Sequence, residues 1–98
     1  MNLSELWTEY CKDTFPQGFG GKDVSGVCVT SIDGYVSGCV SSYLKHKEKS
    51  VNVEQYQRLQ KCGMELEKVL LCTTGEPNKY FSRLYRMCNL VIANVSVA

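Results

Sequence analysis

The sequence lacks any apolar run of the roughly 20 residues that a membrane-spanning helix requires. A secretory signal needs an uninterrupted apolar run near the N-terminus, and here Glu5, Glu9 and Lys12 interrupt any such run. The C-terminus carries no cysteine-terminated lipidation motif. These absences predict a protein that is made and kept in the cytoplasm, with no membrane span.

Charge of one sign and histidine are equally scarce. The formal net charge is +1, which argues against nucleic acid or an anionic membrane as the partner. The single histidine, His46, stands in a lysine-rich segment, and no two cysteines form a C-x-x-C pair. A catalytic thiol normally needs a histidine placed beside it. We therefore expect no catalytic residue, no metal site and no cofactor.

Cysteine, in contrast, is abundant for a chain of 98 residues. An even number in a short chain can indicate three disulfides. The expected cytoplasmic location and the apolar surroundings of most of these cysteines favour free, buried thiols instead. The six are Cys11, Cys28, Cys39, Cys62, Cys72 and Cys88.

Two segments have helical patterns. In residues 2–15 the apolar positions follow the 3.6-residue period, Asn2 and Glu5 are spaced as a capping box, and Pro16 is expected to end the helix. A second helix is expected to begin at Asn52, again with a capping-box pattern, and to end at Gly63.

The remaining apolar segments have strand-like composition. Residues 26–30 and 35–40 flank an Asp-Gly pair at 33–34, which is a strong hairpin signal. Three further strands are expected at residues 66–74, 79–87 and 90–97, separated by turn chemistry at 75–78 and at Asn89. The sequence thus predicts one α+β domain spanning residues 1–98. Its five-stranded antiparallel sheet would be flanked by the N-terminal helix and by a second helix between strands two and three.

Several of these segments resemble profilins. The N-terminal helix carries W-x-x-Y and a later aromatic residue, here Trp7, Tyr10 and Phe15, followed by an apolar strand and a D-G hairpin at residues 28–36. Residues 51–53 resemble the segment that precedes the second profilin helix. The resemblance covers about the first half of the chain and implies a profilin-like fold.

The same resemblance implies a function. The protein would bind monomeric actin and regulate its polymerisation as a monomer, with proline-rich segments or phosphoinositides as further partners. Trp7 and Tyr10 would contact polyproline. The actin or partner surface would lie on the penultimate strand and would consist of Lys79, Arg83, Tyr85 and Arg86.

Roadblock/LC7-type modules provide the alternative. Gly26 and Val27 leading to the Asp-Gly pair, then Gly38 and Cys39, resemble the first hairpin of that family. This resemblance implies a dimeric, Ragulator-like scaffold subunit for a GTPase or motor complex. A monomer would favour the profilin hypothesis, and a dimer would favour the scaffold.

Each candidate residue also has a purely structural interpretation. Trp7 and Tyr10 lie one turn apart and can pack on the sheet instead of binding proline. The aromatic and basic strand can be an ordinary solvent-facing surface. A run of basic residues before the second helix is likewise either a solvated loop or a contact for an acidic partner. That run consists of Lys45, His46, Lys47 and Lys49.

Overall fold

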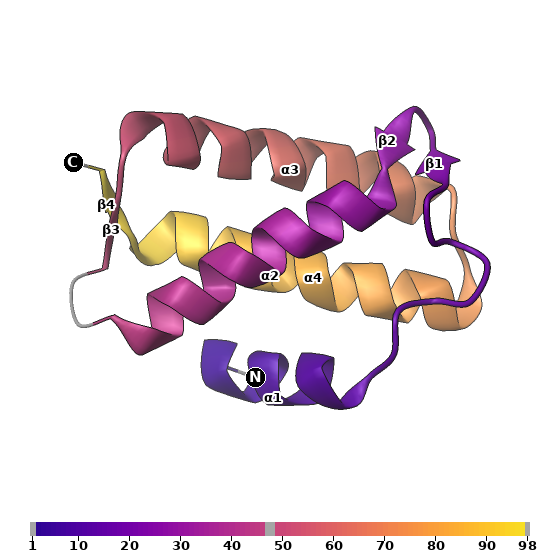
Figure 1. The fold of residues 1–98 in the computed structure, drawn as a ribbon, viewed down its shortest axis with the longest axis horizontal. Coiled ribbons are helices and arrows are strands. Elements are labelled where there is room, and N and C mark those ends of the chain that lie inside the picture. The colour runs from indigo at the N-terminus through magenta and orange to yellow at the C-terminus, as the bar shows by residue number, and fades with distance from the viewer. Residues whose placement is uncertain (1, 47–48, 98) are drawn as a thin grey trace.

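The computed structural model describes residues 2–46 and 49–97, and this part of the chain is mainly helical. Figure 1 shows α3 and α4 side by side, α2 crossing them obliquely, and α1 beside α4 on the side away from α3. The four helices are α1 (Leu3–Lys12), α2 (Val29–Lys45), α3 (Val53–Leu71) and α4 (Gly75–Asn94).

The expected five-stranded antiparallel sheet is wrong. The described residues contain only two ladders, each made of two short strands. β1 (Asp23–Val24) pairs antiparallel with β2 (Val27–Cys28), and β3 (Ser50–Val51) pairs parallel with β4 (Ser96–Val97). The profilin-like α+β class therefore does not describe this chain.

The hairpin expected around residues 33–34 is replaced by α2. The buried positions Val29, Ile32, Val36 and Val40 are spaced by three, four and four residues, which places them on one helix face. Burial of this stripe outweighs the strand preference of its β-branched residues, because that preference depends on packing context. A real two-residue hairpin lies just upstream, where β1 and β2 are joined by Ser25 and Gly26.

Both residues of that turn have positive φ angles, 53° at Ser25 and 78° at Gly26. Positive φ at both central positions matches the right-handed twist of the flanking strands. The glycine adopts this conformation at little cost, whereas the preceding serine is strained. The hairpin directs the chain into the first turn of α2.

The N-terminal helix and its cap are confirmed. The Asn2 side chain accepts a hydrogen bond from the Glu5 backbone N–H at 2.9 Å, and the Glu5 carboxylate accepts one from the Asn2 backbone N–H at 3.1 Å. The helix ends at Lys12, ahead of the expected boundary at residue 15, because Asp13 already has an extended backbone.

The start of α3 is also confirmed, with a reciprocal capping box between Asn52 and Gln55. The expected end at Gly63 is wrong, since the helix continues to Leu71. Gly63 lies in the contact with α4, where a Cβ atom would be 3.5 Å from Asn89 Oδ1 and 4.0 Å from Cys88 Sγ. A glycine there serves close helix packing, and helix termination is not its role.

The three expected C-terminal strands are wrong as well. Residues 66–71 complete α3, and α4 occupies almost all of the next two predicted strands, with Asn89 inside the helix. The turn chemistry at 75–78 falls in the first turn of α4, where Pro77 is tolerated because its missing N–H would have no helical partner. The buried residues of α4 follow a helical period: Tyr80, Phe81, Leu84, Met87, Cys88 and Val91.

The core lies around α4, which contacts each of the other three helices. Phe81, Leu84 and Met87 are fully buried there. Of the six cysteines, all unpaired, only Cys62 and Cys88 are buried, so the expectation that most of these thiols are buried is wrong. No helix in the described part of the chain is long and apolar enough to cross a membrane.

Candidate functional site

A pocket of about 770 Å³ opens between the C-terminal half of α2, the start of α3 and the end of α4. In Figure 1, α2 and α3 diverge toward the end of the molecule that carries β3 and β4. The short strand β3 forms part of the wall. The lining residues are Gly34, Tyr35, Gly38, Cys39, Ser42, Tyr43, His46, Lys49, Ser50, Val51, Gln55, Val91 and Val95.

Two glycines in the interior of α2 face this pocket. A Cβ atom added at Gly34 or at Gly38 would meet no other atom within 4 Å. Each glycine inside a helix costs about 1 kcal/mol relative to alanine. Neither of them relieves a close contact within the folded chain, so what they provide is open volume in the pocket.

The body of the pocket carries no charge at neutral pH. Val91 is buried and Val95 half-buried on its α4 side. Burial raises the pKa of the Tyr35 hydroxyl to about 12. Burial also raises the pKa of the Cys39 thiol above its usual value. Both groups therefore stay protonated and can donate or accept hydrogen bonds as neutral partners.

Positive charge lies at one end of the pocket. The Lys49 ammonium group donates a hydrogen bond to the Tyr43 carbonyl and lies 4.5 Å from the centre of the Tyr43 ring. His46 lines the same end and is exposed. None of the described residues that line the pocket carries a carboxylate. The described lining of this end thus offers a cation and no carboxylate.

A cation–π contact bounds the opposite end. The Arg58 guanidinium lies 4.1 Å from the centre of the Tyr35 ring. Tyr35 also lines a second hollow of about 450 Å³ between α2 and α3. Tyr35 lines both hollows and Arg58 lines the second, so their contact lies where the two hollows adjoin.

The second hollow is lined by more charged side chains, among them Glu65. It holds Cys28, whose thiol lies 3.2 Å from the Ser31 hydroxyl, together with Arg58 and Lys61. The bond to Ser31 lowers the pKa of the Cys28 thiol below its usual value. This hydrogen bond favours the reactive thiolate form of the exposed cysteine.

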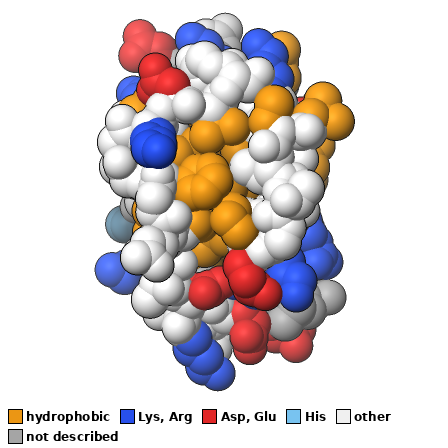
Figure 2. Space-filling model, turned by 90° about the vertical axis from the view of Figure 1, so that its right-hand side faces the viewer, with side chains coloured by type: hydrophobic (Ala, Val, Ile, Leu, Met, Phe, Trp, Pro, Cys, Tyr) orange, Lys and Arg blue, Asp and Glu red, His pale blue; other side chains and the backbone are white. Residues whose placement is uncertain are grey.

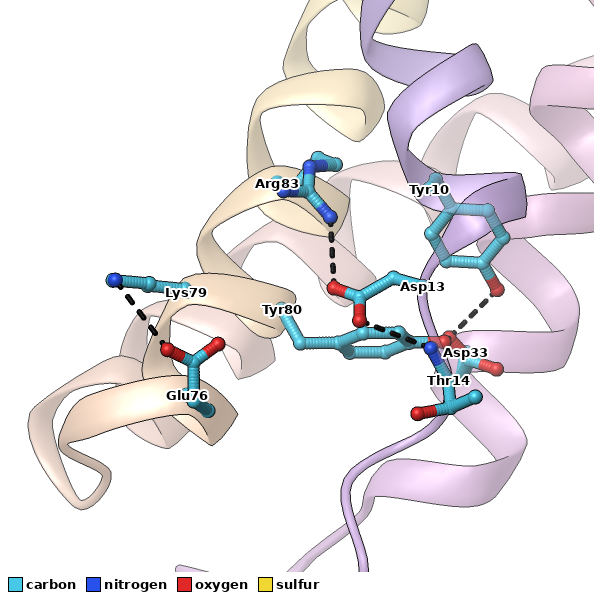
Figure 3. Close-up of polar contacts among 8 residues, drawn as sticks. All are labelled: Tyr10, Asp13, Thr14, Asp33, Glu76, Lys79, Tyr80 and Arg83. Carbon is cyan, nitrogen blue, oxygen red and sulfur yellow. Dashed lines mark hydrogen bonds and ion pairs between the residues drawn. The ribbon is translucent and has the colours of Figure 1, made fainter.

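A separate polar cluster ties three helices together. Asp33 on α2 accepts hydrogen bonds from the Tyr10 hydroxyl of α1 at 2.8 Å and the Tyr80 hydroxyl of α4 at 2.7 Å, both at Oδ1 (Figure 3). Burial raises the pKa of both tyrosine hydroxyls, and the Asp33 carboxylate adds to that effect. The three groups satisfy one another, as buried polar groups require. Their arrangement is that of a structural link between helices.

The predicted polyproline residues belong partly to this link. Trp7 and Tyr10 stack with ring centroids 5.4 Å apart, and both are partly buried against the core. The Tyr10 ring also lies 5.5 Å from Tyr80. These contacts agree with the packing interpretation, except that the surface they pack on is helical. Polyproline binding by Trp7 and Tyr10 stays a prediction.

The predicted actin residues lie on α4, so their assignment to a strand is wrong. Arg83 forms an ion pair with Asp13 at 3.0 Å, and Lys79 forms one with Glu76 at 3.4 Å (Figure 3). The Tyr85 hydroxyl donates to Glu67 at 2.8 Å, and Arg86 is exposed. Because spacings of four and three residues match turns of a helix, Lys79, Arg83 and Arg86 share one face of α4, whereas Tyr85 lies on another.

The predicted basic run is divided by the structure. Lys45 and His46 are exposed at the end of α2, whereas Lys49 is half-buried at the pocket. Lys47 lies outside the described residues. The interpretation as a solvated loop therefore does not hold for Lys49.

A second apolar surface lies at the opposite end of the molecule. Figure 2 shows apolar side chains exposed in a shallow hollow there, bordered below by acidic groups. In the loop between α1 and β1, Phe15 and Phe19 are half-buried, with ring centroids 6.2 Å and 5.8 Å from that of Phe81. These two rings continue the aromatic packing of the core into the loop.

Sequence reasoning missed the pocket. The available signal was the four-residue spacing of Gly34, Gly38 and Ser42, which places small residues on one face only if the segment is a helix. Comparison of the chain with family models, with curated proteins and with solved structures gave no match, so its function has to be inferred from the groups described above.

Proposed function

We propose that this protein is a binding protein that holds a small, largely apolar organic molecule in the pocket between α2, α3 and α4. The observation that carries the proposal is the pocket itself. Its volume of about 770 Å³ falls in the usual range for small-molecule sites, and apolar groups from α2 and α4 surround it together with a few polar ones.

The proposed role needs no bond chemistry. Tyr35 and Cys39 are protonated at neutral pH and suit the orientation of a ligand better than proton transfer. The Asp33 carboxylate is engaged with Tyr10 and Tyr80, which lie on other helices. The absence of enzymatic activity and the cytoplasmic location stay predictions from the sequence.

Actin binding and the roadblock-type scaffold also stay untested predictions. Both were implied by resemblances that required a sheet, and the described chain has no such sheet. The residues assigned to actin lie on α4, where three of the four have partners within the chain. We therefore place the proposed function in the pocket.

The test uses a neutral naphthylamine dye whose fluorescence increases in apolar surroundings, titrated with the intact protein. Gly38→Leu adds a side chain into open space, so it should remove the fluorescence increase while leaving the helical circular dichroism unchanged. Ser42→Leu fills the pocket at a second position and should act in the same way.

Two controls separate pocket filling from other effects. Gly38→Ala brings a similar gain in helix propensity but little volume, so it should retain most of the dye binding. Ser31→Leu adds the same side chain to the same helix at the second hollow and should bind dye like the original protein. Equal dye binding by Gly38→Leu, Ser42→Leu and the original chain would show that the pocket is not the site.

A further inference from the structure

We propose that the natural ligand is an anionic amphiphile, an organic acid with one carboxylate head and an apolar tail. The inference rests on the proposed function and assigns an orientation within the same pocket. The head lies at the end that carries Lys49 and His46, and the tail lies along the glycines of α2.

Lys49 is the group that would hold the head. Its ammonium carries three donor protons, and one of them is donated to the Tyr43 carbonyl. The ring of Tyr43 and the backbone at this point hold the ammonium at the pocket before any ligand arrives. A carboxylate would accept from the remaining protons, in a charge-assisted bond that is stronger than a neutral one.

The other polar groups at this end are consistent with an anion. Ser42 lines this end from the last turn of α2, His46 from its C-cap and Ser50 from β3, so two hydroxyls and an imidazole are available there as hydrogen-bonding groups. Glu54 lies beside the lining residue Gln55 at the start of α3, but it is exposed and does not line the pocket.

The tail would occupy the uncharged part. From His46 back to Gly34 the lining extends over roughly 18 Å of helix at the standard rise per residue. Head and tail can therefore lie at opposite ends of one site. Along this length the tail would contact Val91 and Val95 across from the open positions at Gly34 and Gly38.

The shape of the site favours a small molecule over a peptide helix. A helix bound in a groove needs an uninterrupted channel for several turns. The Arg58 guanidinium over the Tyr35 ring closes the channel between α2 and α3 at one end of the pocket. Tyr43 and Lys49 contact each other at the opposite end.

The experiment compares dodecanoate with dodecanol, which share the same tail, by isothermal titration calorimetry below their aggregation concentrations. Dodecanoate should bind about tenfold or more tightly than dodecanol, since a hydrogen bond to a charged group supplies that difference. Lys49→Met retains a long side chain without the charge and should abolish this preference, with dodecanol affinity unchanged. Lys45→Met removes an exposed lysine outside the pocket and should leave the preference intact.

The outcomes distinguish the two proposals. Equal binding of both compounds to the original chain would overturn the anionic head while leaving an apolar pocket. A parallel loss of both compounds in Lys49→Met would show that Lys49 supports the fold of this region and does not contact the head. No binding of either compound would overturn the inference, and the dye titration would then decide separately whether the pocket binds apolar molecules.

Discussion

Helix α3 packs against α4 in a different way from its approach to α2. Toward α4 it presents Gly63, which is buried and lies near Asn89 and Cys88. Toward α3, α2 presents Gly34 and Gly38, which face open space. The same residue type thus allows one pair of helices to approach closely and leaves a cavity between another pair. A glycine in a helix can be interpreted only once its neighbour is known.

The largest expected effect is in the tightly packed contact. Leu84 is completely buried on α4, so Leu84→Ala should destabilise the protein by about 2–5 kcal/mol through lost burial and a new cavity. Urea unfolding monitored by circular dichroism would measure this. A change of a few tenths of a kcal/mol, like that expected for an exposed position such as Lys61, would mean that α4 is not packed into the core as described.

The next effect concerns the link that ties α2 to the rest of the molecule. Asp33→Ala would leave the hydroxyls of Tyr10 and Tyr80 without their acceptor, and we expect a loss of roughly 2 kcal/mol. Asp33→Asn keeps a carbonyl oxygen that can accept both bonds and should cost less. Equal losses in the two variants, measured by thermal unfolding, would contradict the proposed role of the shared acceptor.

Alkaline titration provides a second measurement of the same link. The pKa values of Tyr10 and Tyr80 are raised above the usual 10.0 in the folded state. A group with a raised folded pKa stabilises the fold below its unfolded pKa, and this contribution is lost as the pH rises further. The contribution of these two hydroxyls to the free energy of unfolding should therefore be constant around neutral pH and should decrease above about pH 10. The double variant Tyr10→Phe, Tyr80→Phe should lack that part of the decrease.

The smallest effects compare the glycine of the α3–α4 contact with a glycine that faces the pocket, and the free energy of unfolding should change in opposite directions at the two. Gly63→Leu should destabilise by about 1–3 kcal/mol because its side chain extends past a contact already at van der Waals distance. Gly38→Ala should stabilise by up to about 1 kcal/mol, since it gains helix propensity in open space. Chemical unfolding of both variants measures the two signs. Destabilisation of both would mean that α2 is packed as closely as α4.

Local signals were sufficient to predict the starts of α1 and α3, whereas the starts of α2 and α4 fall in a predicted strand and a predicted turn. The side chains of Asn2 and Asn52 each form the predicted capping box, which depends only on residues three positions apart. Helix ends were less predictable. Gly63 and Pro16 are both common terminators, yet one lies inside α3 and the other lies beyond the actual end of α1.

The predicted sheet failed for a physical reason. β-Branched and cysteine-rich segments such as residues 26–40 satisfy both a strand composition and a helix period, and only the tertiary partner decides between them. Once α4 is available as that partner, Val29, Ile32 and Val36 become one buried stripe. The pocket could not be predicted for the same reason, because Gly34, Gly38 and Ser42 share one face only if α2 is a helix.

The parallel pair β3–β4 joins the two ends of the segment that contains α3 and α4. Ser96 donates its backbone N–H to the Lys49 carbonyl at 2.7 Å, so the segment that contains α3 and α4 begins and ends at one point. Bringing the two ends together has a single entropic cost for the whole segment, so the segment can open and close as one cooperative unit. Backbone amides of α3 and α4 should therefore exchange with solvent most slowly, while α1 and α2 open earlier as separately attached elements. The pocket, which is built across that boundary, would then be lost before the fold of residues 50–97.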